Sequence, residues 1–158
     1  MPKINPWIWF DTEGEEAAQF YTSVFPNSRI VDVQRYGSAG PRPEGTVMTV
    51  EFDLDGQTFF ALNGGPEFKP NEAISFEVSC GSQDEVDHYW SALAEGGGEH
   101  GPCGWLKDRF GVSWQIVPTR LPELLADPDR EKSQRVMAAM LKMGKIEIDE
   151  LEKAAAAA

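Results

Sequence analysis

Polar side chains that could bind a ligand occur in segments whose other residues are mostly aromatic or aliphatic. The polar members of this set are Asn63, Ser75, Glu77 and Gln115. The aromatic members are Trp7, Trp9, Phe60, Trp105 and Trp114. All of them fall on predicted strands, and we expect the aromatic members to line the inner faces of the sheets. Core packing accounts for each aromatic residue alone, but aromatic walls with a few polar groups are typical of a small-molecule pocket.

Cys103 and Glu77 are the candidates that could act directly on a substrate. A nucleophilic thiolate needs a depressed pKa and a nearby base. His100 is close to Cys103 in sequence, but the intervening Gly101-Pro102 fixes no geometry. Glu77 could serve as a general base in a cavity. For Cys103, an unreactive buried or edge thiol is the favoured explanation. For Glu77, it is a solvated or hydrogen-bonded carboxylate. We keep both residues as pocket candidates and leave the catalytic residues unassigned.

Other motifs favour structural explanations. His88 lies on a predicted helix and His100 in a loop, where packing or surface roles are more common than metal ligation. The glycine-rich stretch 96–101 follows a helix, which favours a helix stop over a methyl-donor loop. Cys80 and Cys103 have no metal-type spacing and form no disulfide framework.

The segments that must position these residues form two similar units. The first is predicted to hold a strand at 4–10, a helix after a capping box at 12–15, a strand at 29–36 and a hairpin of 47–54 with 58–63. Asp55-Gly56 is a strong signal for the two-residue turn of that hairpin.

The second unit repeats the same order. Its elements are predicted as a strand at 73–80, a helix after a capping box at 82–85, a short strand near 99–101 and a hairpin at 104–118. Gly111 supplies the positive φ of the hairpin turn. The repeated order of strand, helix and three strands predicts an internal duplication and an α+β fold of two tandem βαβββ modules.

A helical tail follows the duplicated core. We place the duplicated domain at 1–120, with modules at 3–65 and 72–118, and the tail at 121–158. Val136, Met140 and Met143 share one face of a predicted tail helix. This apolar face needs a surface to cover, either its own sheet or a second subunit, and the sequence leaves both open.

Composition limits the partners. The 158 residues suffice for one ordinary domain with a real core. A net charge of −12, from 26 acidic and 14 basic residues, suits neither nucleic acid nor an anionic membrane. No apolar run approaches the roughly 20 residues that span a bilayer, and no signal peptide opens the chain. We therefore expect a cytoplasmic protein whose partner is a small molecule.

Several motifs together resemble the PhnB-like branch of the vicinal oxygen chelate superfamily, which is often labelled 3-demethylubiquinone-9 3-methyltransferase. They are Trp7-Ile-Trp-Phe10, Glu15-Glu-Ala-Ala-Gln-Phe-Tyr21, Phe60-Ala-Leu-Asn-Gly-Gly-Pro66, Phe110-Gly-Val-Ser-Trp-Gln-Ile-Val-Pro118, Leu121-Pro-Glu-Leu-Leu-Ala-Asp-Pro128 and Gln134-Arg-Val-Met137. The resemblance covers nearly the whole chain. It implies glyoxalase-like modules with curved mixed sheets, often completed as a homodimer in which some relatives exchange elements.

The resemblance also implies a metal position on each of four inward-facing strands. These positions fall near Pro6 or Trp7, at 61–63, at Ala73 and at Gln115. Gln115 alone is a capable ligand, and one weak ligand does not hold a catalytic metal. We therefore expect no resident cofactor, and a divalent metal is disfavoured.

Two functions remain as hypotheses. The first is a small-molecule-binding protein on a glyoxalase-like scaffold without the usual metal ligands. The second is an enzyme, either the family-labelled methyltransferase or a divalent-metal-dependent lyase or isomerase with an atypical site. Fold alone does not choose between them.

Overall fold

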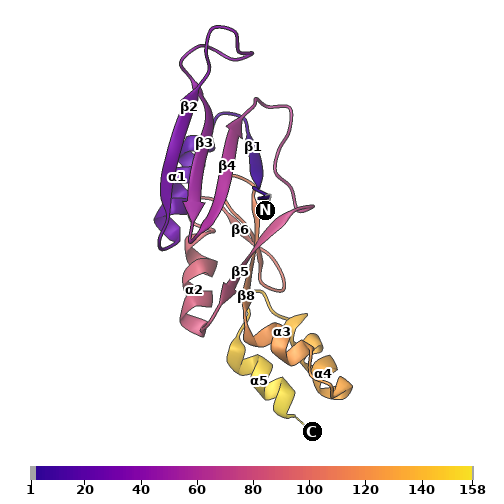
Figure 1. Ribbon diagram of the computed structural model, residues 1–158. Helices are drawn as coiled ribbons and strands as arrows, with labels where there is room; N and C mark the ends of the chain where they lie inside the picture. Colours follow the sequence, from indigo (N-terminus) through magenta and orange to yellow (C-terminus); the bar gives the residue numbers. More distant parts are fainter. Residues whose placement is uncertain (1–2, 158) are drawn as a thin grey trace. The chain divides into compact units, whose positions relative to one another are not determined.

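The computed structural model describes residues 3–157 and divides the chain into two compact units, 1–70 and 71–158. Each unit contains a four-stranded mixed sheet with a helix after its first strand (Figure 1). The predicted α+β fold of two βαβββ modules is confirmed, with the C-terminal helices belonging to unit two. No helix within the described residues is long and apolar enough to cross a membrane.

Unit one has the strand order β1-β4-β3-β2. Its elements are β1 (Trp7–Phe10), α1 (Gly14–Val24), β2 (Arg29–Arg35), β3 (Val47–Leu54) and β4 (Gln57–Asn63). The strand β1 runs parallel to β4, and the other neighbours are antiparallel. Alternation along the strands separates a buried row facing α1, which includes Val50, Phe52 and Ala61, from a more exposed row on the opposite, open face.

The hairpin of β3 and β4 forms around the expected two-residue turn. Leu54 pairs with Gln57, and both Asp55 and Gly56 between them have positive φ, 45° and 90°. A two-residue turn with positive φ at both positions matches the natural twist of a hairpin, and aspartate followed by glycine tolerates that backbone best. This turn is confirmed as the sequence predicted it.

Unit two repeats the topology with the order β5-β8-β7-β6. Its elements are β5 (Ser75–Cys80), α2 (Gln83–Ala92), β6 (Glu99–His100), β7 (Trp105–Lys107) and β8 (Ser113–Pro118). The parallel neighbours are β5 and β8, in the same positions as β1 and β4 of unit one. Leu106, Trp114 and Ile116 lie in the buried row, on the face that α2 covers.

The two helix starts differ, although both were predicted as capping boxes. Ser82 caps α2 as expected, because its hydroxyl accepts a hydrogen bond from the Glu85 N–H at 3.2 Å. The box predicted at Thr12 is wrong. α1 begins at Gly14 with no capping side chain from its own turn, and the Gly14 N–H donates instead to Asn63 Oδ1 at 2.7 Å. A side chain distant in sequence thus supplies this cap.

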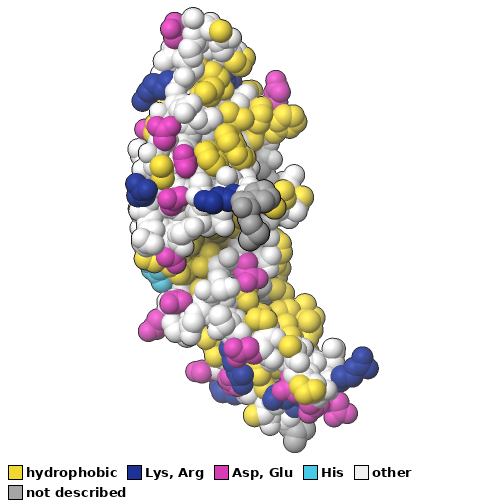
Figure 2. Space-filling model, in the orientation of Figure 1, with side chains coloured by type: hydrophobic (Ala, Val, Ile, Leu, Met, Phe, Trp, Pro, Cys, Tyr) yellow, Lys and Arg dark blue, Asp and Glu magenta, His cyan; other side chains and the backbone are white. Residues whose placement is uncertain are grey.

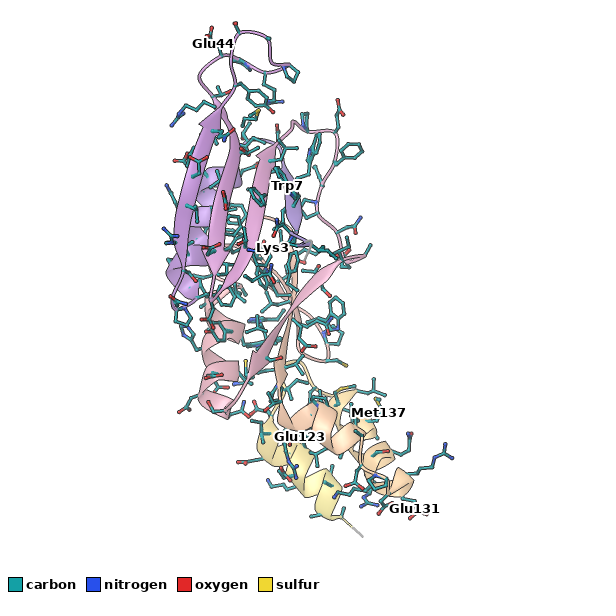
Figure 3. The ribbon with its side chains drawn as sticks, in the orientation of Figure 1. Lys3, Trp7, Glu44, Glu123, Glu131 and Met137 are labelled. Atoms are coloured by element: carbon teal, nitrogen blue, oxygen red, sulfur yellow. The ribbon has the colours of Figure 1, made fainter. Side chains whose placement is uncertain are left out.

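The helical tail packs on its own unit. It comprises α3 (Arg120–Leu125), α4 (Arg130–Met140) and α5 (Ile148–Ala156), and Figure 3 labels Met137 and Glu131 on α4. Its apolar cluster is formed by Leu121, Leu124, Val136, Ile146, Leu151 and Ala155. Val117 of β8 packs against this cluster.

Hydrogen bonds at two places attach the tail to the rest of unit two. The Gln83 side chain donates to the Ile146 carbonyl at 3.1 Å and accepts from the Ile148 N–H at 2.8 Å. The N–H groups of Cys103 and Gly104 donate to the carbonyls of Met143 and Gly144, each at 2.8 Å. The segment that enters β7 is therefore held by the segment that precedes α5.

A buried carboxylate organises the turn between β7 and β8. Asp108 is 2% exposed, and its Oδ1 accepts from the N–H groups of Phe110 and Val112. Its Oδ2 accepts from Trp114 Nε1 at 2.8 Å. Hydrogen bonds to a charged acceptor are stronger than neutral ones, so this side chain holds the turn and the first residues of β8 together.

We predict that Asp108→Ala lowers the free energy of unfolding by about 3 kcal/mol or more, because three donors lose a charged acceptor in a buried place. Chemical denaturation measures this loss. Asp32→Ala, at an exposed position of β2, is the control and is expected to change stability by less than about 0.5 kcal/mol. Equal stabilities of the two variants would contradict the structural role of Asp108.

The two cysteines should differ in reactivity. Cys80 is fully buried at the end of β5, and desolvation raises its pKa from 9.0 to about 11. The raised pKa keeps the native thiol protonated, so the stability that this group contributes is present below pH 9 and lost as pH rises towards 11.

We therefore expect the single thiol of Cys103→Ser to resist a disulfide reagent near pH ~8 until denaturant is added. Cys80→Ala keeps the half-exposed Cys103 and is the comparison. Rapid labelling of native Cys103→Ser would show that Cys80 is accessible and overturn the expectation.

Candidate functional site

The open face of the unit two sheet, opposite α2, carries two cross-strand rows of functional side chains. The first row runs from β6 to β5 through Glu99, Lys107, Ser113 and Ser75. The second runs through Trp105, Gln115 and Glu77. Residues paired across neighbouring strands point to the same face, so the register brings these side chains together from four strands.

A pocket of about 430 Å³ lies at the β6–β7 side of this face. It is lined by Glu72, Glu99, His100, Gly101, Pro102, Trp105, Leu106, Lys107 and Ser113. Its volume falls within the range of roughly 300–1,000 Å³ that is usual for small-molecule sites. The lining combines an indole, several apolar groups and a few charges, all from unit two.

The Ser113 hydroxyl is the exceptional polar atom of this lining. Ser113 is 1% exposed, and its Oγ has no hydrogen-bond partner among the residues that the structure describes. Buried hydroxyls are almost always paired, since an unpaired one costs about 1–3 kcal/mol. This hydroxyl therefore belongs to a residue of the pocket lining and is left without a partner by the described residues.

An ion pair closes one side of the pocket. Lys107 Nζ binds the Glu72 carboxylate in the segment before β5. The hydrogen bond to Lys107 lowers the pKa of Glu72, and the same bond raises the pKa of Lys107. Both groups are therefore charged at neutral pH, and the Lys107 cation already has an anionic partner.

The His100 ring is fixed against α2. It stacks on Trp90 of α2 with ring centroids 4.2 Å apart and an interplanar angle of 6°. Its Nε2 lies 2.8 Å from the Trp90 carbonyl. A carbonyl only accepts, so Nε2 carries the proton of this contact.

The second row contains several of the predicted pocket residues. Gln115 lies on the open face, as expected, and its Nε2 donates to Ser75 Oγ at 2.9 Å. Glu77 lies next to Gln115 in the register, is exposed and accepts from the Ser79 hydroxyl. Trp105 is half-buried and lines the pocket directly. The structure thus brings Ser75, Glu77, Trp105 and Gln115 together on one face.

Three other predicted candidates form a separate aromatic surface on the open face of unit one. Trp7 stacks on Phe60 with centroids 4.5 Å apart and an angle of 7°. Trp9 donates its indole N–H to the Gly65 carbonyl and packs edge-on against Phe68. Trp7 is 55% exposed and is labelled in Figure 3. Figure 2 shows hydrophobic side chains gathered over this part of unit one.

Asn63 and Trp114 lie elsewhere, contrary to the expectation that they share the inner faces. Asn63 is buried on the α1 side, where it caps Gly14 and donates to the Thr12 and Val47 carbonyls. Trp114 is 3% exposed on the α2 side and donates to Asp108. Alternation along β8 places Trp114 and Gln115 on opposite faces, so only one of them can reach the open face.

Cys103 lies at the entrance to β7 rather than in the pocket lining. Its backbone has φ of 57°, and its thiol donates to the Met140 carbonyl at 3.6 Å. The adjacent Gly101 and Pro102 do line the pocket. Cys103 therefore connects the pocket wall with the tail.

The metal that the fold implies does not fit the side chains at the expected positions. Trp7, Ala61 and Ala73 have no ligating atoms in their side chains, Asn63 is committed to the α1 cap, and the Gln115 amide binds Ser75. Within residues 3–157, no three His, Cys, Asp or Glu side chains are grouped so that they could hold a metal ion. We therefore derive no chemical step through a metal.

The glycine run 96–98 is a helix stop, as the sequence favoured. Gly96 and Gly97 have φ of 79° and 122°, and the Gly98 N–H donates to the Ala94 carbonyl at 2.9 Å. The run joins α2 to β6.

The sequence did not indicate the principal members of the pocket. From the sequence, Lys107 could hold an anion or, more commonly, be an exposed turn charge, and Glu72, Glu99 and Ser113 were not candidates. The available signal was the cross-strand register. If residues are paired outward from the turn at Asp108–Val112, Lys107 on β7 lies directly opposite Ser113 on β8.

The family model described as 3-demethylubiquinone-9 3-methyltransferase matches residues 2–117. A solved structure from Bacillus cereus, described as a putative 3-demethylubiquinone-9 3-methyltransferase, PhnB protein, is 35% identical. The match covers 75% of this chain and 100% of that one, with a TM-score of 0.66.

Two more distant structures show the fold. Protein PA1353 from Pseudomonas aeruginosa is 21% identical, with a TM-score of 0.63, and the match covers 75% of this chain and 98% of that one. The fosfomycin resistance protein FosX from Mesorhizobium loti is 14% identical, with a TM-score of 0.57, and the match covers 80% of this chain and 98% of that one. Among curated proteins, no sequence matches significantly. The family model and the B. cereus protein together show that the chain belongs to the PhnB-like, 3-demethylubiquinone-9 3-methyltransferase family.

Proposed function

We propose that this protein binds a small organic molecule in the unit two pocket, and that it does so without a divalent metal. The observation that carries the proposal is the buried Ser113 hydroxyl, which lines the pocket and has no partner among the described residues. A ligand group that pairs with this hydroxyl removes a standing desolvation penalty on binding.

The rest of the lining supports a ring-containing ligand. The half-buried Trp105 offers an indole face, which binds flat rings through dispersion and stacking. Pro102 and Leu106 add apolar surface. Apolar walls with a small number of placed polar groups are the usual composition of a site that recognises one class of compound.

The family description names a methyltransferase, and a methyl-transfer role is the enzymatic alternative. Within residues 3–157, the glycine run 96–98 does not favour it, because this run ends a helix instead of following a strand of a parallel sheet. Fosfomycin resistance belongs to the Mesorhizobium protein, whose likeness concerns the fold. Ligand recognition at the pocket is therefore the role that the side chains support best.

Indole and phenol provide a direct test of the pocket. In ¹H–¹⁵N spectra of the full chain, we expect the largest shifts at the Trp105 indole N–H and at the amides of Gly101 and Ser113, since these residues line the pocket. Trp105→Ala should weaken binding by about tenfold through lost ring contact.

The matched control is Trp7→Ala, which removes an exposed tryptophan from unit one and should leave the affinity within about twofold. Shifts confined to unit one would refute the proposed site. Equal loss of affinity in the two variants would refute it as well.

Thermal unfolding tests the metal-free part of the proposal and the enzymatic alternative. A ligand that binds the native state must raise Tm by mass action. We expect no rise in Tm with Mn²⁺, Ni²⁺, Zn²⁺ or S-adenosylmethionine, because the side chains at the implied metal positions do not form a ligand set. A rise with a metal that disappears in Gln115→Ala would establish a metal site, and a rise with S-adenosylmethionine would favour methyl transfer.

A further inference from the structure

Resting on the proposed function, we propose that the pocket selects ring compounds that donate hydrogen bonds, as amines or hydroxyls, and rejects carboxylates, with Ser113 as a specificity-determining residue. The inference follows from the balance of donors and acceptors in the lining and from the arrangement of its charges.

Acceptors predominate in the pocket. Glu72 and Glu99 contribute carboxylates. His100 also belongs to the lining, but its Nε2 is engaged by the Trp90 carbonyl. A ligand that carries N–H or O–H groups therefore finds more partners here than a ligand with acceptors alone, for which Ser113 is the unpaired donor.

The one cation of the lining is already neutralised. Lys107 binds Glu72, and Glu99 lies directly opposite Lys107 on the neighbouring strand. The hydrogen bond to Glu72 is also the largest cause of the raised pKa of Lys107, which agrees with this pairing. With two carboxylates and one ammonium, the formal charge of the lining is −1 when His100 is neutral, so a carboxylate ligand meets repulsion and must displace Glu72 to reach Lys107.

Ser113 then sets the orientation of the ligand. It lies across from Lys107 on β8, and Trp105 extends from the same face of β7 two residues before Lys107. A ring against Trp105 therefore has the Ser113 hydroxyl and the Glu99 carboxylate within the same pocket lining. Because Ser113 has no other partner among the described residues, its pairing depends on what the pocket contains.

Three compounds with the same ring test the selection. Benzylamine, benzyl alcohol and benzoate differ chiefly in the charge and the donors of one substituent. In NMR titrations near neutral pH, followed at the Trp105 indole N–H, we expect benzylamine and benzyl alcohol to bind and benzoate to bind at least about tenfold more weakly.

Two variants separate the roles of the side chains. Ser113→Ala should weaken benzyl alcohol by about fivefold, and its Tm should equal or exceed that of the wild type because an unpaired buried hydroxyl is removed. Glu99→Gln should weaken benzylamine by about threefold or more and leave benzyl alcohol within about twofold. Glu95→Gln is the control, since it changes the net charge equally at an exposed position outside this lining.

The outcomes distinguish this inference from the proposed function. Failure of all three compounds to shift the pocket residues would overturn both. Benzoate binding as tightly as the other two would overturn the selection alone, and the pocket would stand. An unchanged affinity of Ser113→Ala for benzyl alcohol would remove the hydroxyl from the site. A loss of stability in that variant would show that the hydroxyl has a structural role, and it would also remove it from the site.

Discussion

The buried Asp108 carboxylate is the interaction on which the geometry of unit two most depends. It binds two backbone N–H groups of the turn and the indole of Trp114. These bonds fix how many residues lie between β7 and β8, and therefore which residues face each other. A shift of one residue would turn Ser113 and Gln115 towards α2 and bring Trp114 to the open face. One carboxylate thus sets the register that assembles the pocket.

Unit one uses a neutral side chain for a comparable purpose. Asn63 at the end of β4 joins the start of α1 to β3, and its own carbonyl accepts from the Tyr36 hydroxyl at 2.7 Å. In both units, a polar residue on the helix-covered side holds elements together while the open face keeps its aromatic and charged groups. The helix-covered face of each sheet is therefore structural, and the open face carries the groups that could recognise a ligand.

The elements that follow local rules were predictable from the sequence. Period-two alternation and the Asp55-Gly56 turn identified the first hairpin, and Ser82 with Glu85 identified the start of α2. The cap of α1 could not be found in this way, since its acceptor is Asn63, which follows 49 residues later. Capping rules look only within one turn.

The candidate site was predictable in part for the same reason. Alternation placed Gln115 opposite Trp114, and the structure brings Gln115, Ser75 and Glu77 together on one face. Composition gave no indication that Ser113 would be buried without a partner, because that depends on its neighbours across two strands and on Glu72 reaching Lys107. Residue types suggested an aromatic site, whereas the charges of the lining emerge only from tertiary contacts.

The short segment 101–104 contributes both to the pocket wall and to the attachment of the tail. Gly101 and Pro102 form part of the pocket wall, and the next two peptide groups hold the carbonyls of Met143 and Gly144 in the tail. A change in the position of this segment at the pocket would therefore act on the hydrogen bonds that hold the tail. If a bound molecule favoured one position of the segment, linkage would require the tail to influence binding of that molecule by the same free energy.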